Sequence, residues 1–346
     1  MKNRLIWLCV FIIVLLVVLA VSIPAERGSY SASAYSDFSE KPAAFLPMFP
    51  GALSSAYVDT MLSRDYRRIY YVPSSEELEP EVIKPEELLQ SVLLNNDIIA
   101  FYGHPRSPQM GIIGQYSLEE LEPLLLEFAA SYDKANGLRG VIPALYLIYG
   151  TCWPEGEIGV LSDAVIKKYI EYAAERGWYV FLDHQIGKYP VEKAVKALLP
   201  YLKYENVHLA LDPEWRTTKP MKEIGSVTAA EVNMAQKMVE EYMAENSIPG
   251  RRFLVIHQFK EWMIHNRSQV KSNFDRIQLI LCMDGFGSPS LKKNTYAFNA
   301  LATNIPLKSF KLFSKPVAEG AGYDIPMMTP DEVFALDPRP YLIMMQ

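Results

Sequence analysis

Two carboxylates stand two residues apart in the segment Leu209–Trp215, LALDPEW, where an apolar run gives way to Asp212, Pro213 and Glu214. Carboxyl groups that share one site cannot all ionise, so their pKa values separate, and one can donate a proton while another stays charged. That separation is what general acid–base hydrolysis needs. The same residues are also compatible with a simple acidic turn, so their meaning depends on what surrounds them.

Other apolar runs along the chain end in the same manner. The runs at 97–105, 178–187, 251–259 and 277–287 carry, in that order, His104, Asp183, His257 and Asp284 at or near their ends. Barrel enzymes keep their chemistry at the carboxyl ends of several strands at once. The repetition therefore predicts one ring of polar groups, provided that these runs are strands of one barrel.

Strand and helix patterns alternate from residue 97 to the end of the chain. The predicted strands lie at 97–105, 139–150, 178–187, 206–215, 251–259, 277–287, 307–315 and 338–346, and the predicted helices at 117–137, 161–177, 190–204, 228–247, 261–272 and 290–303. Eight strands in about 250 residues have the size and rhythm of a (β/α)8 TIM barrel. A doubly wound open sheet is the alternative, but no glycine-rich phosphate loop follows the first strand, where FYGHPRSP stands.

Alternate residues of a barrel strand face inward, and the outward residues should be the more consistently aliphatic. This rule points Asp183, Asp212, Asp284, His257 and Lys311 inward. The predicted catalytic residues are Glu214 as proton donor, Asp284 or Asp183 as base, and Asp212 as the neighbour that sets their pKa. The predicted substrate-binding residues are His104, Tyr102, Tyr146, Gln185, Trp215, His257, Gln258 and Lys311.

Four other interpretations stay open. In the first, Asp183, Asp212, Asp284 and Lys311 form only a paired, buried network, since buried charges need partners, and the barrel is a non-catalytic binding protein. His104, His257 and the aspartates are suitable ligands for a divalent metal, although the sequence holds no HExxH motif and no cofactor is predicted. A phosphodiesterase using two histidines, and Schiff-base chemistry at Lys311, are the remaining alternatives.

Charge and cysteine content narrow the class of protein. The net charge is −6, from 34 basic and 40 acidic residues without a basic stripe, so nucleic acid is not an expected partner. Only three cysteines are present, and they do not suggest a disulfide framework. The expected partners are a small molecule or glycan and, through the N-terminus, a membrane, while the oligomeric state stays open.

The N-terminal segment predicts export. Lys2 and Arg4 precede Leu5–Ile23, which carries no charge and has the length of a transmembrane helix. We expect a signal-anchor, or a cleaved signal peptide, over residues 1–25, a linker over 26–51, lead-in helices over 52–96 and the barrel over 97–346. The barrel would then be held at the cell membrane by a single pass and lie outside the cytoplasm, or be secreted if the segment is cleaved.

Structural roles are expected for a second set of residues. Ser162 and Asp163 look like a helix cap, and Thr228 with Glu231 like a capping box. A long loop follows the seventh predicted strand. Its Tyr323 and Asp324 could reach the mouth as a lid, although a surface loop is the expected use.

Several blocks resemble one family. The segments LALDPEW, IGSVTAAEVN, HQF, MDGFG and YDIPMMTP occur here in the order in which a group of exported bacterial proteins, many predicted as lipoproteins, carries them. The resemblance implies an exported bacterial barrel and no particular substrate, and this chain lacks a well-placed lipobox cysteine. The plan also resembles glycoside hydrolase barrels that keep an acid/base glutamate at the end of the fourth strand, which implies that role for Glu214. Those enzymes usually carry a nucleophile on strand seven, where this chain has Phe313, Ser314 and Lys315.

Overall fold

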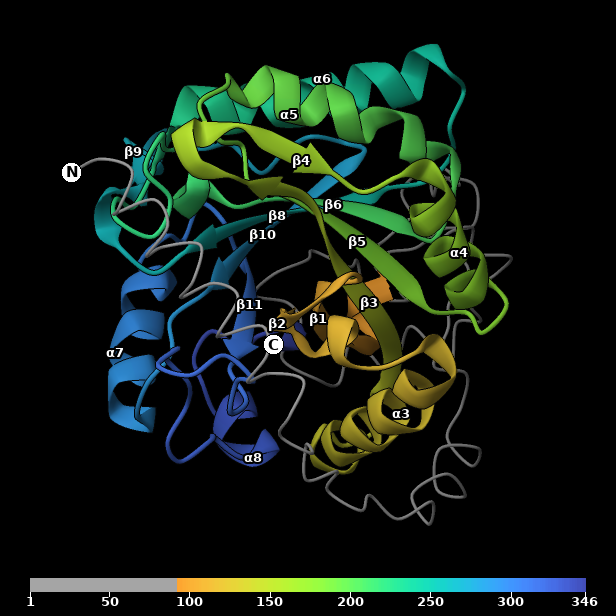
Figure 1. Ribbon diagram of the computed structural model, residues 1–346, viewed down its shortest axis with the longest axis vertical. Helices are drawn as coiled ribbons and strands as arrows, with labels where there is room; N and C mark the ends of the chain where they lie inside the picture. Colours follow the sequence, from red (N-terminus) through yellow and green to blue (C-terminus); the bar gives the residue numbers. More distant parts are fainter. Residues whose placement is uncertain (1–91) are drawn as a thin grey trace, which may run out of the picture. The chain divides into compact units, whose positions relative to one another are not determined.

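Eight buried segments pair side by side and in parallel in the computed structural model, which describes residues 92–346. The strands are β1 (Asn96–His104), β3 (Gly140–Cys152), β5 (Tyr179–His184), β6 (Val207–Leu211), β8 (Arg252–Gln258), β10 (Ile277–Met283), β11 (Leu307–Leu312) and β12 (Leu342–Met345). They correspond one to one with the eight predicted strands (Figure 1).

Strand β1 closes the barrel because it pairs with both β3 and β12. Ile98 is aligned with Ile142 on one side and with Leu342 on the other. The remaining order, β12-β11-β10-β8-β6-β5-β3, is continuous. The (β/α)8 prediction is therefore confirmed for the described residues, and the open doubly wound sheet is wrong.

The two faces of the strands form separate apolar clusters, as the alternation rule predicts. The interior cluster includes Ala100, Ala144, Phe181, Ala210, Val255 and Cys282. The outer layer, packed against the helices, includes Val180, Leu182, Leu209, Leu211, Leu279 and Leu281, and Phe310 and Leu312 belong to a third outward cluster. Every residue that the rule assigned in these lists has the expected face.

Within residues 92–346 six α-helices surround the strands: α3 (Leu118–Ala135), α4 (Asp163–Ala174), α5 (Val191–Leu198), α6 (Ala229–Glu245), α7 (Pro289–Ala300) and α8 (Pro330–Phe334) (Figure 1). The predicted capping box of α6 is confirmed, because the Thr228 side chain accepts from the Glu231 amide and Glu231 accepts from the Thr228 amide. Ser162 stands at the N-cap of α4 but makes no side-chain cap bond. Its neighbour Asp163 instead accepts from the Tyr201 hydroxyl.

The prediction of a helix over 261–272 is wrong. This stretch forms two 3-10 turns, η9 (Glu261–Met263) and η10 (Arg267–Gln269), separated by β9 (Ile264–His265), which pairs with β7 (Val227–Thr228). The physical reason lies in contacts outside the segment: Asn304 donates to the backbone carbonyls of Arg267 and Val270 and holds the chain out of helical register. His265 consequently lies on a short strand.

Two hairpins extend the barrel at its carboxyl end. β2 (Ser107–Gly111) runs antiparallel to β1, and β4 (Ile158–Val160) runs antiparallel to β3. Short 3-10 turns complete the chain at η4 (Val92–Leu94), η5 (Ile112–Gln115), η6 (Pro154–Gly156), η7 (Leu199–Lys203) and η8 (Pro213–Trp215). Of these turns, η8 carries Glu214, the predicted proton donor.

A buried ion cluster links three segments of the chain at the amino end of the barrel. Asp97, which is fully buried at the start of β1, accepts from Arg139 Nε at 3.0 Å and from both terminal nitrogens of Arg339 at 2.6 and 2.8 Å. Burial raises the pKa of Asp97, and Arg339 opposes that effect. The cluster joins the segments that precede β3 and β12 to β1 at the closure.

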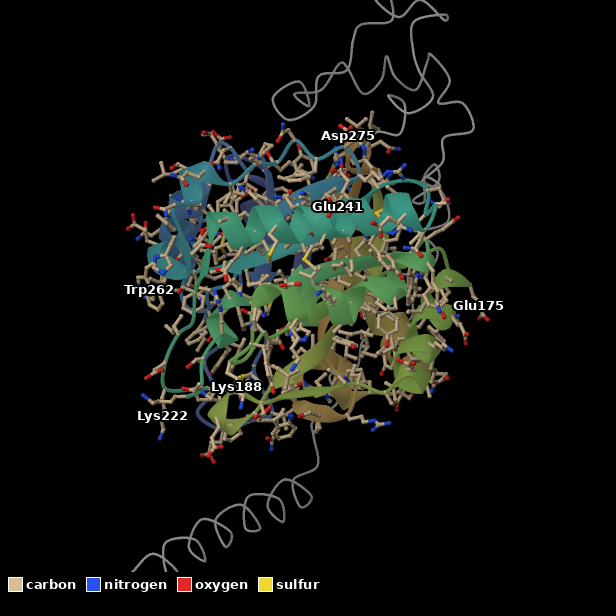
Figure 2. The ribbon with its side chains drawn as sticks, turned by 90° about the horizontal axis from the view of Figure 1, so that it is seen from above. Glu175, Lys188, Lys222, Glu241, Trp262 and Asp275 are labelled. Atoms are coloured by element: carbon tan, nitrogen blue, oxygen red, sulfur yellow. The ribbon has the colours of Figure 1, made fainter. Side chains whose placement is uncertain are left out.

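The two ends of the barrel can be told apart in Figure 2. Lys188, Lys222 and Trp262, each in a segment that follows a strand, lie toward one side of the view, whereas Glu175, which precedes β5, lies on the other. The predicted membrane segment, the linker and nearly all of the lead-in helices lie outside the described residues. Within residues 92–346, no helix has the length and apolar character to span a membrane.

Candidate functional site

Seven polar side chains, each from a different strand or its end, meet inside the carboxyl end of the barrel. They are Tyr102, Tyr146, Asp183, Asp212, His257, Asp284 and Lys311, and all are buried. All seven are among the residues that the sequence pointed to. Lys311 was expected in mid-strand, but it is the penultimate residue of β11 and so also lies near the carboxyl end.

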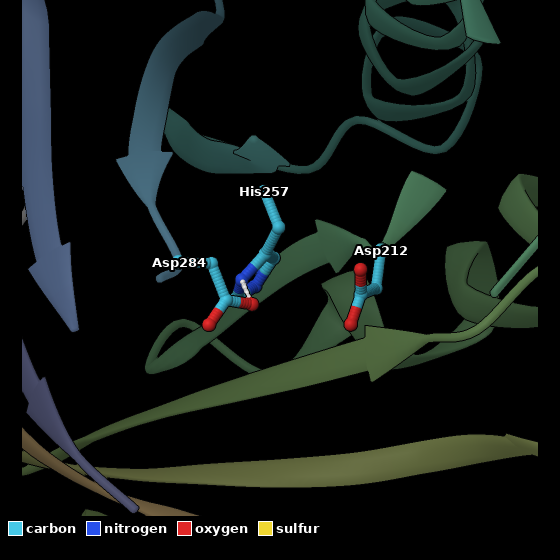
Figure 3. Close-up of side chains that lie close together, drawn as sticks. All are labelled: Asp212, His257 and Asp284. Atoms are coloured by element: carbon cyan, nitrogen blue, oxygen red, sulfur yellow. Dashed lines mark hydrogen bonds and ion pairs between the residues drawn. The ribbon is translucent and has the colours of Figure 1, made fainter. Parts of the chain in front are cut away.

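His257 lies at the centre of this group. Its Nδ1 is 2.8 Å from Asp284 Oδ2, and its Nε2 is 2.8 Å from the Tyr146 hydroxyl. Burial by itself lowers the pKa of His257, but Asp183 and Asp284 together outweigh it and hold the pKa well above the ordinary value. Figure 3 shows Asp284 joined to the imidazole and Asp212 on the other side of the ring. The ring is therefore a buried imidazolium.

Asp284 and Lys311 form the tightest charge pair of the site. Lys311 Nζ lies 3.0 Å from Asp284 Oδ1 and 3.2 Å from Oδ2, and 3.8 Å from the centre of the Tyr102 ring. Burial raises the pKa of Asp284, but Lys311 and His257 outweigh it and bring the pKa below the usual range. Burial lowers the pKa of Lys311, and Asp284 and Asp212, with Asp284 the larger contributor, oppose it, so the net shift is upward. Lys311 is thus an ammonium ion, which disfavours Schiff-base chemistry, since that needs a free amine.

Asp183 is held on one oxygen only. Its Oδ2 accepts from the Tyr102 hydroxyl at 2.9 Å and lies 3.7 Å from His257 Nε2. Its Oδ1 is buried and has no hydrogen-bond partner among residues 92–346. Burial raises the pKa of Asp183, and His257 and Lys311 oppose this effect. The oxygen without a partner adds to the cost of charging this carboxyl group, so it acts in the same direction as burial.

Asp212 and Glu214 flank Pro213 in the 3-10 turn η8, and the Glu214 amide donates to Asp212 Oδ1 at 3.3 Å. Burial raises the pKa of Asp212 well above its ordinary value. Burial also raises the pKa of Glu214 to about 7, with Asp284 adding to the effect and Lys311 and His257 opposing it. Asp212 is only 1% exposed, whereas Glu214 is partly exposed. Glu214 is therefore the carboxyl group of the site that solvent can reach.

Two predicted substrate-binding residues have structural partners. Gln258 is fully buried, donates to the Lys260 and Glu261 carbonyls, and accepts from Arg267. Gln185 is buried, and its oxygen accepts from the Cys152 amide. Gln258 thereby fixes the backbone that follows β8, and the Gln185 oxygen fixes the last residue of β3. Substrate binding by these two residues stays a prediction.

His104 is the last residue of β1, and Trp215 is the last residue of η8, directly after Glu214. The Arg106 amide donates to His104 Nδ1 at 3.1 Å, and burial, together with Arg106, lowers the pKa of His104. Trp215 is partly exposed beside Glu214. Both remain predicted contacts of a substrate.

One group of side chains has metal-ligand spacing. Ligand atoms of Asp212, His257 and Asp284 all lie within 4.8 Å of one another. Both ring nitrogens of His257 are, however, already hydrogen-bonded, and Lys311 supplies a cation to Asp284. A metal ligand must be a neutral imidazole, and a divalent ion would stand beside an ammonium group. These residues therefore fit a metal poorly.

Lys292 is a further buried charge next to the site that the sequence pattern does not predict. This lysine, on α7, is 1% exposed, and its Nζ lies 2.7 Å from Asp324 Oδ2 in the loop after β11. The signal that could have revealed it is its spacing, because Lys292, Tyr296 and Asn299 form the buried stripe of the helix. Asp324, predicted as part of a lid, is instead a buried anchor.

Comparisons with known proteins add little to this geometry. No family model matches the chain, and no curated protein matches it, so the resemblance to exported bacterial proteins stays a prediction. Among solved structures, the chain is similar to a family 18 chitinase from Crocus vernus, with 11% identity and a TM-score of 0.38 over 72% of this chain and 92% of that one. At that identity and score the likeness carries no argument about activity.

Proposed function

We propose that the protein hydrolyses a glycosidic bond at the carboxyl end of the barrel, with Glu214 as the proton donor. The observation that supports this best is the contrast between two carboxyl groups of one site. Glu214 is partly exposed with a pKa raised to about 7, while Asp284 beneath it stays ionised. Pairs of titratable groups whose surroundings push their pKa values apart are the usual signature of acid–base assignments.

Glu214 is suited to the proton transfer itself. Below pH 7 its carboxyl group is protonated and can give its proton to the oxygen of the leaving sugar. In an inverting mechanism the incoming water gives its proton to a second carboxylate, and Glu214 regains its own proton from solvent. A group whose pKa lies near neutrality serves well in both directions.

The two predicted bases differ in their fitness for that role. Asp284 has a pKa below the usual range, so it is a poor proton acceptor and acts instead as a fixed charge that keeps His257 and Lys311 positively charged. Asp183 has a raised pKa and one unpartnered oxygen, so it is the better second acceptor. Asp212 remains the uncharged neighbour that lets Glu214 ionise without a second negative charge beside it.

The substrate class follows from the same reasoning. A glycan offers hydroxyl groups to His104 and a ring face to Trp215. The uncharged segment Leu5–Ile23 supports a glycan of the cell envelope or of the surroundings, because it predicts a protein that faces outward. The membrane tether and the location are part of this proposal.

A screen of the full-length protein against a panel of glycans tests the assignment. Glu214→Gln keeps the size of the side chain and removes the proton, and we expect its kcat to fall by roughly 10²–10⁴-fold. Glu241→Gln, on the exposed face of α6 (Figure 2), is the matched control and should retain full activity. Hydrolysis of no glycan, or equal rates for wild type and Glu214→Gln, would sink the proposal.

A metal-dependent hydrolase is the second candidate, because Asp212, His257 and Asp284 have metal-ligand spacing. A metal that binds only the folded state stabilises it by an amount that grows with the logarithm of metal concentration, about 2.7 kcal/mol at a hundredfold excess over Kd. We expect the Tm to stay unchanged on adding Zn²⁺, Mn²⁺, Mg²⁺ or Ca²⁺ to the EDTA-treated protein. A rise that grows with metal concentration and that Asp284→Asn abolishes would favour the metal enzyme over the glycosidase proposed above.

A further inference from the structure

We infer that Lys292 and Asp324 form a buried ion pair that positions the Asp284–Lys311 pair, so that the loop between β11 and α8 is a working part of the site. The catalytic meaning of this role rests on the proposed function, whereas the contacts themselves do not. Neither residue is on the inner face of the barrel, and neither touches the substrate in this scheme. They act through the strand ends that carry Asp284 and Lys311.

The ammonium group of Lys292 binds three acceptors at once. It lies 2.7 Å from Asp324 Oδ2, donates to the backbone carbonyl of Lys311 at 2.7 Å, and donates to the backbone carbonyl of Gly285 at 2.9 Å. An ammonium has three N–H groups, so its capacity is filled. Gly285 directly follows Asp284, and therefore one cation fixes the backbones of both members of the pair in the site.

Asp324 completes the clamp from the other side. Its Oδ1 accepts from the Gly287 amide at 3.0 Å, and its Oδ2 accepts from the Phe313 amide at 3.0 Å. Its own amide donates to the Phe313 carbonyl at 2.9 Å. Gly287 has a φ of 134°, which favours glycine, so this turn after β10 is shaped to present its amide to the carboxylate. The loop is thereby joined to the ends of both β10 and β11.

The charges alternate from the outside of the barrel to its centre. Asp324 pairs with Lys292, and Asp284 pairs with Lys311, while Asp284 also raises the pKa of Lys292 against the larger effect of burial. Lys292 can rotate away from none of its partners, because it is almost fully buried. Without it, the carbonyls of Gly285 and Lys311 would lose a shared donor and the two strand ends could separate.

Stability alone is the competing explanation for such a pair. Removing one member of a buried ion pair leaves the other charged and unpaired, which destabilises any fold. A positioning role makes a further prediction: when Lys292 is replaced, the distance from the Asp284 carboxylate to the His257 ring increases. The 2.8 Å contact between Asp284 Oδ2 and His257 Nδ1 is one cause of the raised pKa of His257, so that pKa reports the position of Asp284.

The experiment follows the imidazole ¹⁵N shifts of the full-length protein by NMR between pH 5 and 10. The chain has five histidines, so His257 can be assigned by comparison with His257→Asn. We expect the pKa of His257 to fall toward its ordinary value in Lys292→Met and to stay lowered in Lys292→Met/Asp324→Asn. The double variant leaves neither charge of the pair buried alone, so we expect its Tm to exceed that of Lys292→Met.

Arg139→Met is the matched control, because Arg139 belongs to a buried ion cluster at the opposite end of the barrel. It should lower Tm without moving the pKa of His257. An unchanged His257 pKa in both Lys292 variants, or an equal shift in Arg139→Met, overturns the proposal. If a glycan is hydrolysed, the double variant should also lose kcat at least tenfold with little change in KM. If none is hydrolysed, the proposed function fails and the NMR result still decides the positioning role.

Discussion

Glu214 and Asp284 are both carboxyl groups of the same mouth, yet their surroundings give them opposite properties. Asp284 lies between Lys311 and His257, and these cations keep it ionised. Glu214 has no cation within hydrogen-bond distance among the described residues, and burial dominates its pKa. The proton for an acid-catalysed step is therefore stored on the residue that solvent can reach.

The pH dependence of hydrolysis follows from that difference. Glu214 must be protonated at the start of the reaction and loses its proton at about pH 7. We expect kcat/KM to fall about tenfold for each pH unit above 7, and to fall also toward acid pH, where Asp183 takes up its proton. The measurement is a pH–rate profile on whichever glycan the screen identifies. A rate that rises through pH 7 to 9 would remove Glu214 as the acid.

Glu214 should also reduce stability at alkaline pH. Its folded pKa is raised from 4.5 to about 7, so the folded state favours the proton. That contribution is fully present below pH 4.5 and is lost as pH rises to 7, at a cost of up to about 3 kcal/mol. Glu214→Gln should thus be more stable than wild type at pH 8 and nearly equal at pH 4.5, by urea denaturation. Equal stability at both values would contradict the raised pKa.

At the scale of elements, alternation in the sequence was enough to place the strands and their faces. The inward assignments of Asp183, Asp212, Asp284, His257 and Lys311 needed only period two and the position of the aliphatic residues. The helix predicted over 261–272 failed because its conformation depends on Asn304, more than 30 residues away. Local pattern carries no information about such a partner.

Long-range contacts also explain the site residues that the sequence could not give. The alternation of inward and outward residues along a strand predicts that Asp284 and Lys311 face inward. It does not predict that their charged atoms lie 3.0 Å apart. It also does not predict that Arg267 donates a hydrogen bond to the side chain of Gln258, a residue that was expected to bind substrate. Lys292 lies on a helix and reaches the strand ends from outside, so no strand pattern could include it.

The ion cluster at the amino end joins β1 to the segments before β3 and β12. Asp97→Asn removes the charge and leaves Arg139 and Arg339 without their carboxylate. Breaking a buried pair in this way lowers the free energy of unfolding by about 3–5 kcal/mol. Glu192→Gln, in an exposed pair with Lys196 on α5, should lower it by less than about 1 kcal/mol. Urea denaturation measures both, and similar losses for the two variants would contradict a structural role for Asp97.

At the scale of the whole barrel, closure depends on four residues of β12. This strand supplies hydrogen-bond partners to β1 on one side and to β11 on the other. Lys311 is aligned with Met344, so the seam passes directly beside the charged site. The strand that closes the barrel is therefore also the strand that lies next to Lys311 of the site.

Deleting residues 342–346 should abolish the cooperative thermal transition. The edges of β1 and β11 would be left unpaired, and an open parallel edge invites aggregation. Circular dichroism and size-exclusion chromatography would report the loss of a single transition and of the monodisperse peak. Removal of Gln346 alone, which keeps all of β12, is the control and should leave the transition in place.

The shared contacts of His257 have a consequence for how this barrel can evolve. Tyr146, Asp183, Asp284 and Lys311 each depend on a partner within the same group, so a change at one position leaves another buried and unsatisfied. Single steps away from this arrangement should be selected against, and neutral drift should be confined to the shell around it. Homologous barrels are thus expected to inherit these positions together or to have replaced them together.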